Sequence, residues 1–206
     1  MMGTDIGMNP KGMSVRHIPK GVMELMEKLD FVTYSHSCRV WQMAAGIEES
    51  MGMGDGVLSA SAFVHDIGKY YIPASILDKR GSLTPLEREI IDLHPYIGYC
   101  ILDGAGVCEE VKHTVLCHHG MQPKTLKPLP AWQGRVEELA GMLKTLDVFE
   151  ALTADRPYRR GITKEQAYAF MEQGAYHADV LRCLQTVENM WGKEKTGISG
   201  NGQAPY

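Results

Sequence analysis

Histidines and aspartates that can bind metal ions recur at wide intervals along this chain of 206 residues. Seven of them stand out, at positions His36, His65, Asp66, His94, His118, His119 and Asp147. Neutral imidazoles and carboxylates suit iron, manganese or zinc, and a carboxylate between imidazoles can bridge two such ions. Residues so far apart in the sequence can meet at one point only if several secondary-structure elements pack together there. The pattern therefore predicts a metal centre assembled between packed helices.

Helical signals cover almost all of the chain, and no run of alternating β-branched residues predicts a strand. The fold class is therefore all-α, and the length favours one domain with a sizeable core over two small ones. Both ends are rich in Gly without periodicity, so we expect loose segments at 1–18 and 192–206 around a single helical bundle at 19–191. The expected helices cover 20–29, 33–51, 56–68, 108–119, 133–154 and 179–191.

Several helix boundaries carry local signals. Thr84, followed by Pro85 and by Glu87 at the third helical position, predicts a capping box and a helix start. Thr163 with Gln166 predicts a similar start further on. Pro95 restricts the backbone of the residue before it, so one helix should end at position 94 and the next begin at position 95.

Composition limits the classes of partner. A formal net charge of −4 argues against binding to duplex nucleic acid, whose phosphates call for a broadly basic surface. The five cysteines form no CxxC pair, and no apolar run is long enough for a signal peptide or a membrane span. We therefore expect free thiols, a cytoplasmic location and no membrane contact. A small phosphorylated ligand remains compatible with this charge.

Five stretches of the sequence, between residues 34 and 160, resemble the HD-domain metal-dependent phosphohydrolases, and within them the HD-GYP branch. They read YSHSCRV, HDIGKYYIPASILDKRGSLTPLE, HPYIGYCIL, VLCHH and LDVFEALTADRPYR. The resemblance implies an HD-type helical domain. It also implies that one metal ion is bound by His36, His65, Asp66 and Asp147, and a second by His94, His118 and His119, with Asp66 bridging the two.

The resemblance implies further roles. Two divalent ions are expected, iron or manganese first, with zinc, nickel and magnesium also compatible. A hydroxide held between them would attack phosphorus, with Asp66 and Lys69 as catalytic residues. Lys69 would also approach the scissile phosphate, and Arg156 and Arg159 would hold the substrate through charge-assisted hydrogen bonds.

The chain departs from the branch at three places. Leu126, Lys127 and Pro128 stand where Gly, Tyr and Pro would fall, which leaves the substrate open. Val32 occupies the position at which members with three metals carry a glutamate ligand, so we expect two ions. Glu150 replaces the commoner aspartate, and we expect its carboxylate to orient a ligand or an arginine.

Three functions remain open on this basis. The first is a phosphodiesterase that hydrolyses a cyclic dinucleotide, with cyclic di-GMP the leading substrate. The second is an HD phosphohydrolase that acts on another nucleotide or phosphoester. The third is a non-catalytic, metal-containing module that binds a nucleotide or a signalling partner. A homodimer is compatible with each.

Overall fold

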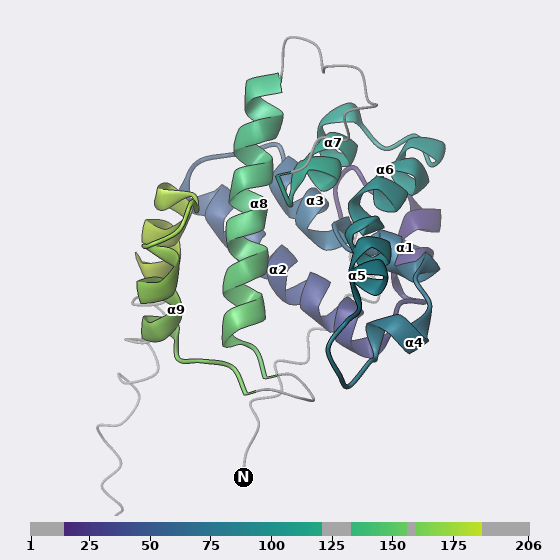
Figure 1. Cartoon of the computed structure of the whole chain (residues 1–206). Helices are drawn as coiled ribbons and strands as arrows, with labels where there is room; N and C mark the ends of the chain where they lie inside the picture. The colour runs from purple at the N-terminus through teal and green to yellow at the C-terminus, as the bar shows by residue number, and fades with distance from the viewer. Residues whose placement is uncertain (1–14, 121–132, 156–159, 187–206) are drawn as a thin grey trace, which may run out of the picture.

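The structure is a computed structural model that describes residues 15–120, 133–155 and 160–186. All of the regular elements in these ranges are helical, which confirms the all-α prediction (Figure 1). Residues 178–186 are also helical. The named elements are α1 (Lys20–Met26), α2 (Phe31–Ser50), α3 (Val57–Val64), the 3-10 helix η1 (Ile67–Tyr71), α4 (Ala74–Leu77), α5 (Pro85–Asp92), α6 (His94–Gly104), α7 (Glu109–Cys117), α8 (Gln133–Thr153) and α9 (Lys164–Met171).

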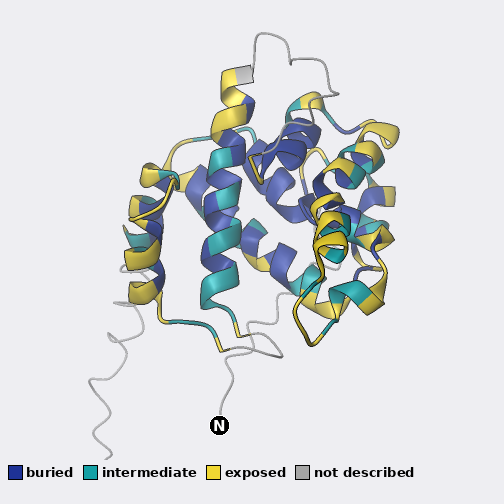
Figure 2. Cartoon of the chain, viewed as in Figure 1, coloured by how far each residue is buried: buried dark blue, intermediate teal, exposed yellow. Residues whose placement is uncertain are grey.

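Helix α3 lies at the centre of the bundle, and all eight of its residues are buried. It packs against α2, α7 and α8, and α7 also packs against α6 and α8. In Figure 1 the long helix α8 crosses in front of α2, with α3 on one side of it and α9 on the other. Figure 2 shows the buried residues gathered on these inner helices, while α5 and the outer side of α9 are exposed. The core is therefore formed around α3.

The start of α3 is stabilised by a side chain from another helix. Its N-cap residue, Gly56, has φ 75 and provides no side-chain cap. Instead the buried Glu48 of α2 accepts hydrogen bonds from the backbone N–H groups of Leu58 at 2.8 Å and Ser59 at 3.2 Å. A carboxylate there satisfies N–H groups that the first turn of a helix leaves unpaired, and it lies at the positive end of the helix dipole.

The two predicted capping boxes are confirmed. Thr84 accepts from the backbone N–H of Glu87 and donates its own backbone N–H to the Glu87 carboxylate, with Pro85 at the first helical position. Thr163 and Gln166 form the same reciprocal pair at the start of α9. Both starts depend on residues within one turn, and so the local sequence was enough to predict them.

Other expected boundaries differ from the structure. The single helix expected over 56–68 is wrong, because α3 ends at Val64 and the chain turns at Asp66, with φ −96 and ψ 5, into the separate helix η1. The helix after α5 begins at position 94 rather than 95. The first helix ends at Met26 rather than at position 29, and the connection expected after η1 contains the short helix α4.

The first described residues pack onto the bundle. Val15 is buried in the core, Arg16 donates to the carbonyl of Gly54 at 2.9 Å, and His17 Nε2 lies 2.8 Å from the carbonyl of Asp55. The domain boundaries expected at 18 and 191 stay a prediction. Among the described residues, the helices are all too short or too polar to span a bilayer.

Candidate metal centre

The seven predicted ligands come from five segments of the chain, and most of them stand at helix ends. One lies within α2 and one within α8, two form the turn between α3 and η1, one begins α6 and two follow α7. At a helix end the backbone turns away, so a side chain there can reach across to a neighbouring helix. The positions are His36, Asp147, His65, Asp66, His94, His118 and His119, in that order of segments.

The first group joins α2, α3 and α8. His36, His65 and Asp147 each place one ligand atom within 4.8 Å of the others. His36 Nε2 lies 2.9 Å from Asp147 Oδ1, and His65 Nε2 lies 3.9 Å from the same oxygen. Two imidazole nitrogens and a carboxylate oxygen at this spacing can hold a divalent ion.

The second group joins α6 and the end of α7. His94, His118 and His119 also place one nitrogen each within 4.8 Å of the others. The His118 and His119 ring centroids are 4.0 Å apart, and those of His94 and His118 are 5.3 Å apart. His119 is exposed, whereas the other two are buried, so this group lies nearer to solvent.

Asp66 lies between the two groups. Its Oδ2 is 3.4 Å from His65 Nε2 and 3.8 Å from His36 Nε2, on the side of the first group. Its Oδ1 is 3.3 Å from His94 Nε2, on the side of the second. Lys69 also donates to Asp66 Oδ2 at 2.7 Å. One carboxylate thus presents one oxygen to each group, which is the geometry of a bridging ligand.

Backbone carbonyls orient three of the imidazoles in the same way. The Nδ1 atoms of His65, His94 and His118 donate to the carbonyl three residues earlier, at 2.8, 2.7 and 2.6 Å. An Nδ1 that donates carries the proton, so in the neutral ring Nε2 has a free lone pair. Each Nε2 is therefore ready to bind a metal ion.

The donor atoms fit a cation better than they fit one another. His94 Nε2 and His118 Nε2 lie 3.4 Å apart, and with both protons on Nδ1 two lone pairs face each other. Among the described residues, buried His65 Nε2 has no partner with hydrogen-bond geometry. A buried acceptor left in this way is unfavourable unless a positive group satisfies it. The residues present therefore fit bound divalent ions.

Burial and charge set the protonation of the centre. Burial lowers the pKa of His94 to about 4 and that of His118 well below its usual value, so both rings are neutral near pH 7. Burial alone would raise the pKa of Asp66. The positive charge of Lys69 is the largest of the effects that outweigh it and hold this pKa well below its usual range. Neutral imidazoles around an ionised carboxylate are the forms that coordinate metals.

Glu150 contacts His36 from outside the first group. The carboxylate accepts from His36 Nδ1 and, through its other oxygen, from Arg39 Nε at 2.5 Å. Burial lowers the pKa of His36, but the hydrogen bonds to Asp147 and Glu150 outweigh this effect and raise the pKa to about 9. Glu150 thus contacts both an expected ligand and an arginine, as the prediction requires, and its role toward a bound metal stays a prediction.

Arg39 is a residue that the sequence reasoning missed. It lies three residues after His36 on α2, and Glu150 lies three residues after Asp147 on α8. Residues three apart share a helix face. This spacing was a signal in the sequence, but using it required knowing that α2 and α8 face each other.

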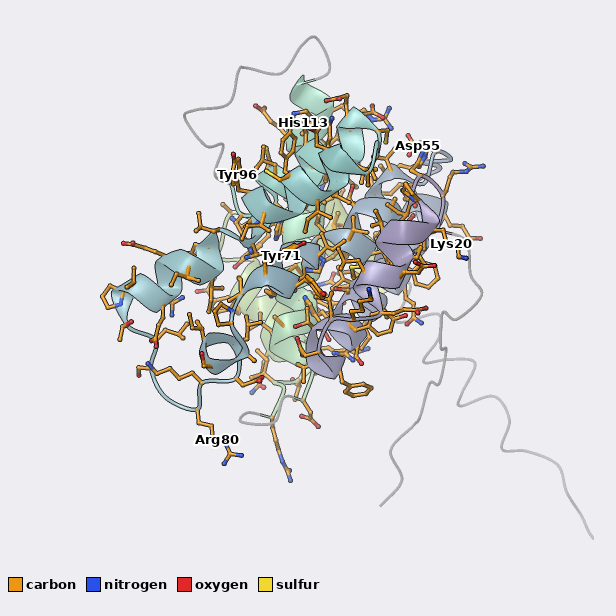
Figure 3. The ribbon with its side chains drawn as sticks, turned by 90° about the vertical axis from the view of Figure 1, so that its right-hand side faces the viewer. Lys20, Asp55, Tyr71, Arg80, Tyr96 and His113 are labelled. Carbon is orange, nitrogen blue, oxygen red and sulfur yellow. The ribbon has the colours of Figure 1, made fainter. Side chains whose placement is uncertain are left out.

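Other predicted residues fall elsewhere or outside the described ranges. Arg156, Arg159 and the Pro-rich segment with Lys127 lie outside the residues that the structure describes. Val32 is 42% exposed near the start of α2. His113, which is not among the seven predicted ligands, lies on α7, apart from η1, which Tyr71 marks in Figure 3.

The chain matches a protein-family model and several named relatives. The HD domain family model matches residues 33–166. A cyclic di-GMP phosphodiesterase of Pseudomonas aeruginosa is 31% identical over 172 residues, covering 81% of this chain and 42% of the relative. A cyclic di-GMP phosphodiesterase of Thermotoga maritima is 31% identical over 153 residues, covering 72% of this chain and 42% of the relative. This chain therefore spans less than half the length of these relatives.

A solved structure shares the fold. The crystal structure of the HD domain of the phosphodiesterase PgpH of L. monocytogenes in complex with cyclic-di-AMP has a TM-score of 0.60 and 16% identity. The match covers 89% of this chain and 100% of that domain. With the family match over more than half of the residues, the chain belongs to the HD domain family.

Proposed function

We propose that this chain is a metal-dependent phosphodiesterase that hydrolyses a cyclic dinucleotide, with cyclic di-GMP the first candidate substrate. The proposal is supported by the activities named for the Pseudomonas and Thermotoga relatives. It is also supported by a centre in which imidazoles and carboxylates gather in two groups, as phosphoester hydrolysis with two metal ions needs. Iron or manganese is the proposed metal, at two ions per chain.

The observation that carries the proposal is the placement of Asp66. With one oxygen 3.3 Å from His94 Nε2 and the other 3.4 Å from His65 Nε2, it can belong to both groups at once. Bound there, two divalent ions would lower the pKa of a bridging water and neutralise charge on the phosphate oxygens. Asp66, fully buried and ionised, would hold the two positions at a fixed separation.

The proposed substrate contacts come from cations beside the centre. Lys69 is 24% exposed and donates to Asp66, so its ammonium group lies at the edge of the centre where a phosphate would enter. It would stabilise negative charge that develops on the phosphate during hydrolysis. Arg156 and Arg159 follow α8 in the sequence, and we propose that they grip the phosphates of the substrate. Arg156→Ala should then raise KM more than it lowers kcat.

The central experiment combines metal analysis with product analysis. Protein purified anaerobically is expected to contain two equivalents of iron or manganese and to convert cyclic di-GMP to a linear product. Asp66→Asn keeps the side-chain volume but removes the charge, so it should lose both the metals and the activity. Metal-loaded protein that binds cyclic di-GMP without releasing a linear product would favour the non-catalytic module instead.

A second candidate function is hydrolysis of another nucleotide or phosphoester, and the sequence of the segment after His119 favours it. This segment reads GMQPKTLKPLP and lacks the GYP residues of the branch that the chain resembles. The test is a panel of cyclic di-GMP, cyclic di-AMP, a mixed cyclic dinucleotide and simple phosphomonoesters. Turnover of a monoester alone would assign the chain to the general HD phosphohydrolases. The cytoplasmic location and a homodimer stay predictions.

A further inference from the structure

Two pairs of residues face each other across α2 and α8. His36 and Arg39 lie three residues apart on α2, and Asp147 and Glu150 lie three residues apart on α8. His36 Nε2 contacts Asp147 at 2.9 Å, Arg39 Nε donates to Glu150 at 2.5 Å, and His36 Nδ1 donates to the other Glu150 oxygen. The pairs therefore form a continuous chain of contacts from the half-exposed guanidinium to the metal-facing nitrogen.

His36 differs from the other buried imidazoles in what holds its Nδ1. For His65, His94 and His118 the acceptor is a neutral backbone carbonyl, whereas for His36 it is a carboxylate. A carboxylate acceptor fixes the ring and makes the opposite nitrogen a stronger donor to a metal ion. Arg39, bonded to the second oxygen, holds that carboxylate in place and offsets part of its charge.

The two groups also differ in the number of carboxylates around them, and therefore in negative charge. The first group contains Asp147, with Glu150 directly behind His36. The second group consists of three imidazoles and has no carboxylate of its own. Asp66 presents one oxygen to each group, and Lys69 pairs with the oxygen on the side of the first group, so Asp66 does not account for the extra negative charge there. A divalent cation is attracted more strongly to the group with more negative charge.

We propose that Arg39 and Glu150 position His36 and thereby make the His36, His65 and Asp147 group the tighter of two metal positions. Arg39 acts only through Glu150, and Glu150 only through His36, so both are positioning residues. The proposal rests on the proposed function in that both groups bind divalent ions. It does not depend on which phosphoester is the substrate.

The test is a titration of the metal-depleted full chain with Mn²⁺. Binding is measured by calorimetry and by the EPR signal of free Mn²⁺. The wild type should bind two equivalents in two resolved steps. Glu150→Gln keeps an oxygen acceptor for His36 but removes the charge. It should weaken the tighter step about 10- to 100-fold and leave the weaker step unchanged. Arg39→Met should weaken the same step by less, and Arg39→Lys should recover part of the loss.

Arg135→Met is the matched control. Arg135 is 42% exposed and forms ion pairs with Asp55 and Glu110, much as the 47% exposed Arg39 pairs with Glu150. It lies fifteen residues before Glu150 on α8, roughly 22 Å along the helix axis at about 1.5 Å per residue. Both binding steps should be unchanged in this variant. If it weakened the tighter step as much as Arg39→Met does, the proposed role of Arg39 would be overturned.

Two results would overturn the inference and leave the proposed function standing. One is a Mn²⁺-dependent phosphodiesterase whose two binding steps are both unaffected by Glu150→Gln and Arg39→Met. The other is an equal loss in both steps. The reverse outcome separates the claims as well. If the wild type hydrolyses no phosphoester, but both variants bind Mn²⁺ more weakly in the tighter step alone, the inference is supported and the proposed function is contradicted. Should Glu150→Gln fail to fold, the half-exposed Arg39→Met still tests the same step.

Discussion

Gly68 decides how closely the Asp66 turn approaches the second group. A Cβ built on this glycine would lie 2.0 Å from the carbonyl oxygen of His94 and 2.8 Å from the backbone nitrogen of Gly98. Both atoms belong to the backbone of α6, so neither can move away as a flexible side chain would. The missing side chain lets η1 rest directly on α6, and this brings Asp66 to within 3.3 Å of His94 Nε2.

We expect Gly68→Ala to destabilise the fold by about 3 kcal/mol and to lower metal content, because the clash pushes η1 away from α6. Urea denaturation and elemental analysis measure the two effects. Gly46→Ala is the control, since a Cβ at this position within α2 meets no atom within 4 Å among the described residues. Alanine there should leave stability unchanged or raise it by up to about 1 kcal/mol. Equal behaviour of the two variants would contradict the packing argument.

Lys69 provides a prediction about chemistry rather than folding. Its ammonium group donates to Asp66 at the edge of the centre. Lys69→Met should therefore lower kcat roughly 10²- to 10³-fold while metal content stays the same. Lys20→Met serves as the comparison, because Lys20 pairs with Glu24 on an exposed helix surface. A loss of metal in Lys69→Met would instead show that the lysine stabilises the ligand arrangement.

Helix α3 depends on its neighbours more than on its own ends. It is buried along its whole length, and its Ser59 and Ser61 hydroxyl groups donate to the carbonyls of Gly56 and Val57. Its N-terminal N–H groups are satisfied by Glu48 of α2. Because α3 ends at the residue before His65, any shift of this helix moves both His65 and Asp66. The contact between α2 and α3 therefore sets the position of the metal centre.

Glu48→Ala should lower the free energy of unfolding by about 2 kcal/mol, since it leaves two buried N–H groups at the start of α3 unpaired. Glu49→Ala changes the neighbouring exposed glutamate and should stay within about 0.5 kcal/mol of the wild type. Chemical denaturation of both proteins without metal separates this effect from metal binding. Matching midpoints for the two variants would show that solvent satisfies those N–H groups.

In the whole molecule, candidate metal ligands from five helices meet at one place. The ligand groups draw on α2, α3, α6, α7 and α8, which include most of the inner helices of the bundle. An ion held by side chains from several of these helices would bind the folded chain and not the unfolded one. Metal binding and folding are therefore linked.

Removal of metal should consequently lower the melting temperature. At a free Mn²⁺ concentration about one hundred times Kd, one site contributes about 2.7 kcal/mol, and the Tm should rise further with added Mn²⁺. Thermal unfolding with a chelator and with increasing Mn²⁺ measures this dependence. Asp66→Asn should show a much smaller rise. A wild-type Tm that is the same with and without chelator would contradict the linkage.

Local signals in the sequence were reliable where the partner is close in the chain. The capping boxes at Thr84 and Thr163 need only residues three positions further on, and both are present. The family motif likewise identified the histidines and aspartates that gather in two groups. The helix expected over 56–68 was wrong at its end, because α3 stops at Val64 and Gly68 is a point of contact with α6.

From the amino-acid order alone, the helical class, the family and the histidines and aspartate that gather in two groups followed, because each depends on periodicity or on a short motif. The contacts from Glu48 to α3 and from Arg39 to Glu150 did not follow. The second of these joins residues 111 positions apart. Such contacts depend on how helices pack against one another, and packing is a property of side-chain shapes on several elements at once. The folded arrangement, not any segment, gives the two groups their different surroundings.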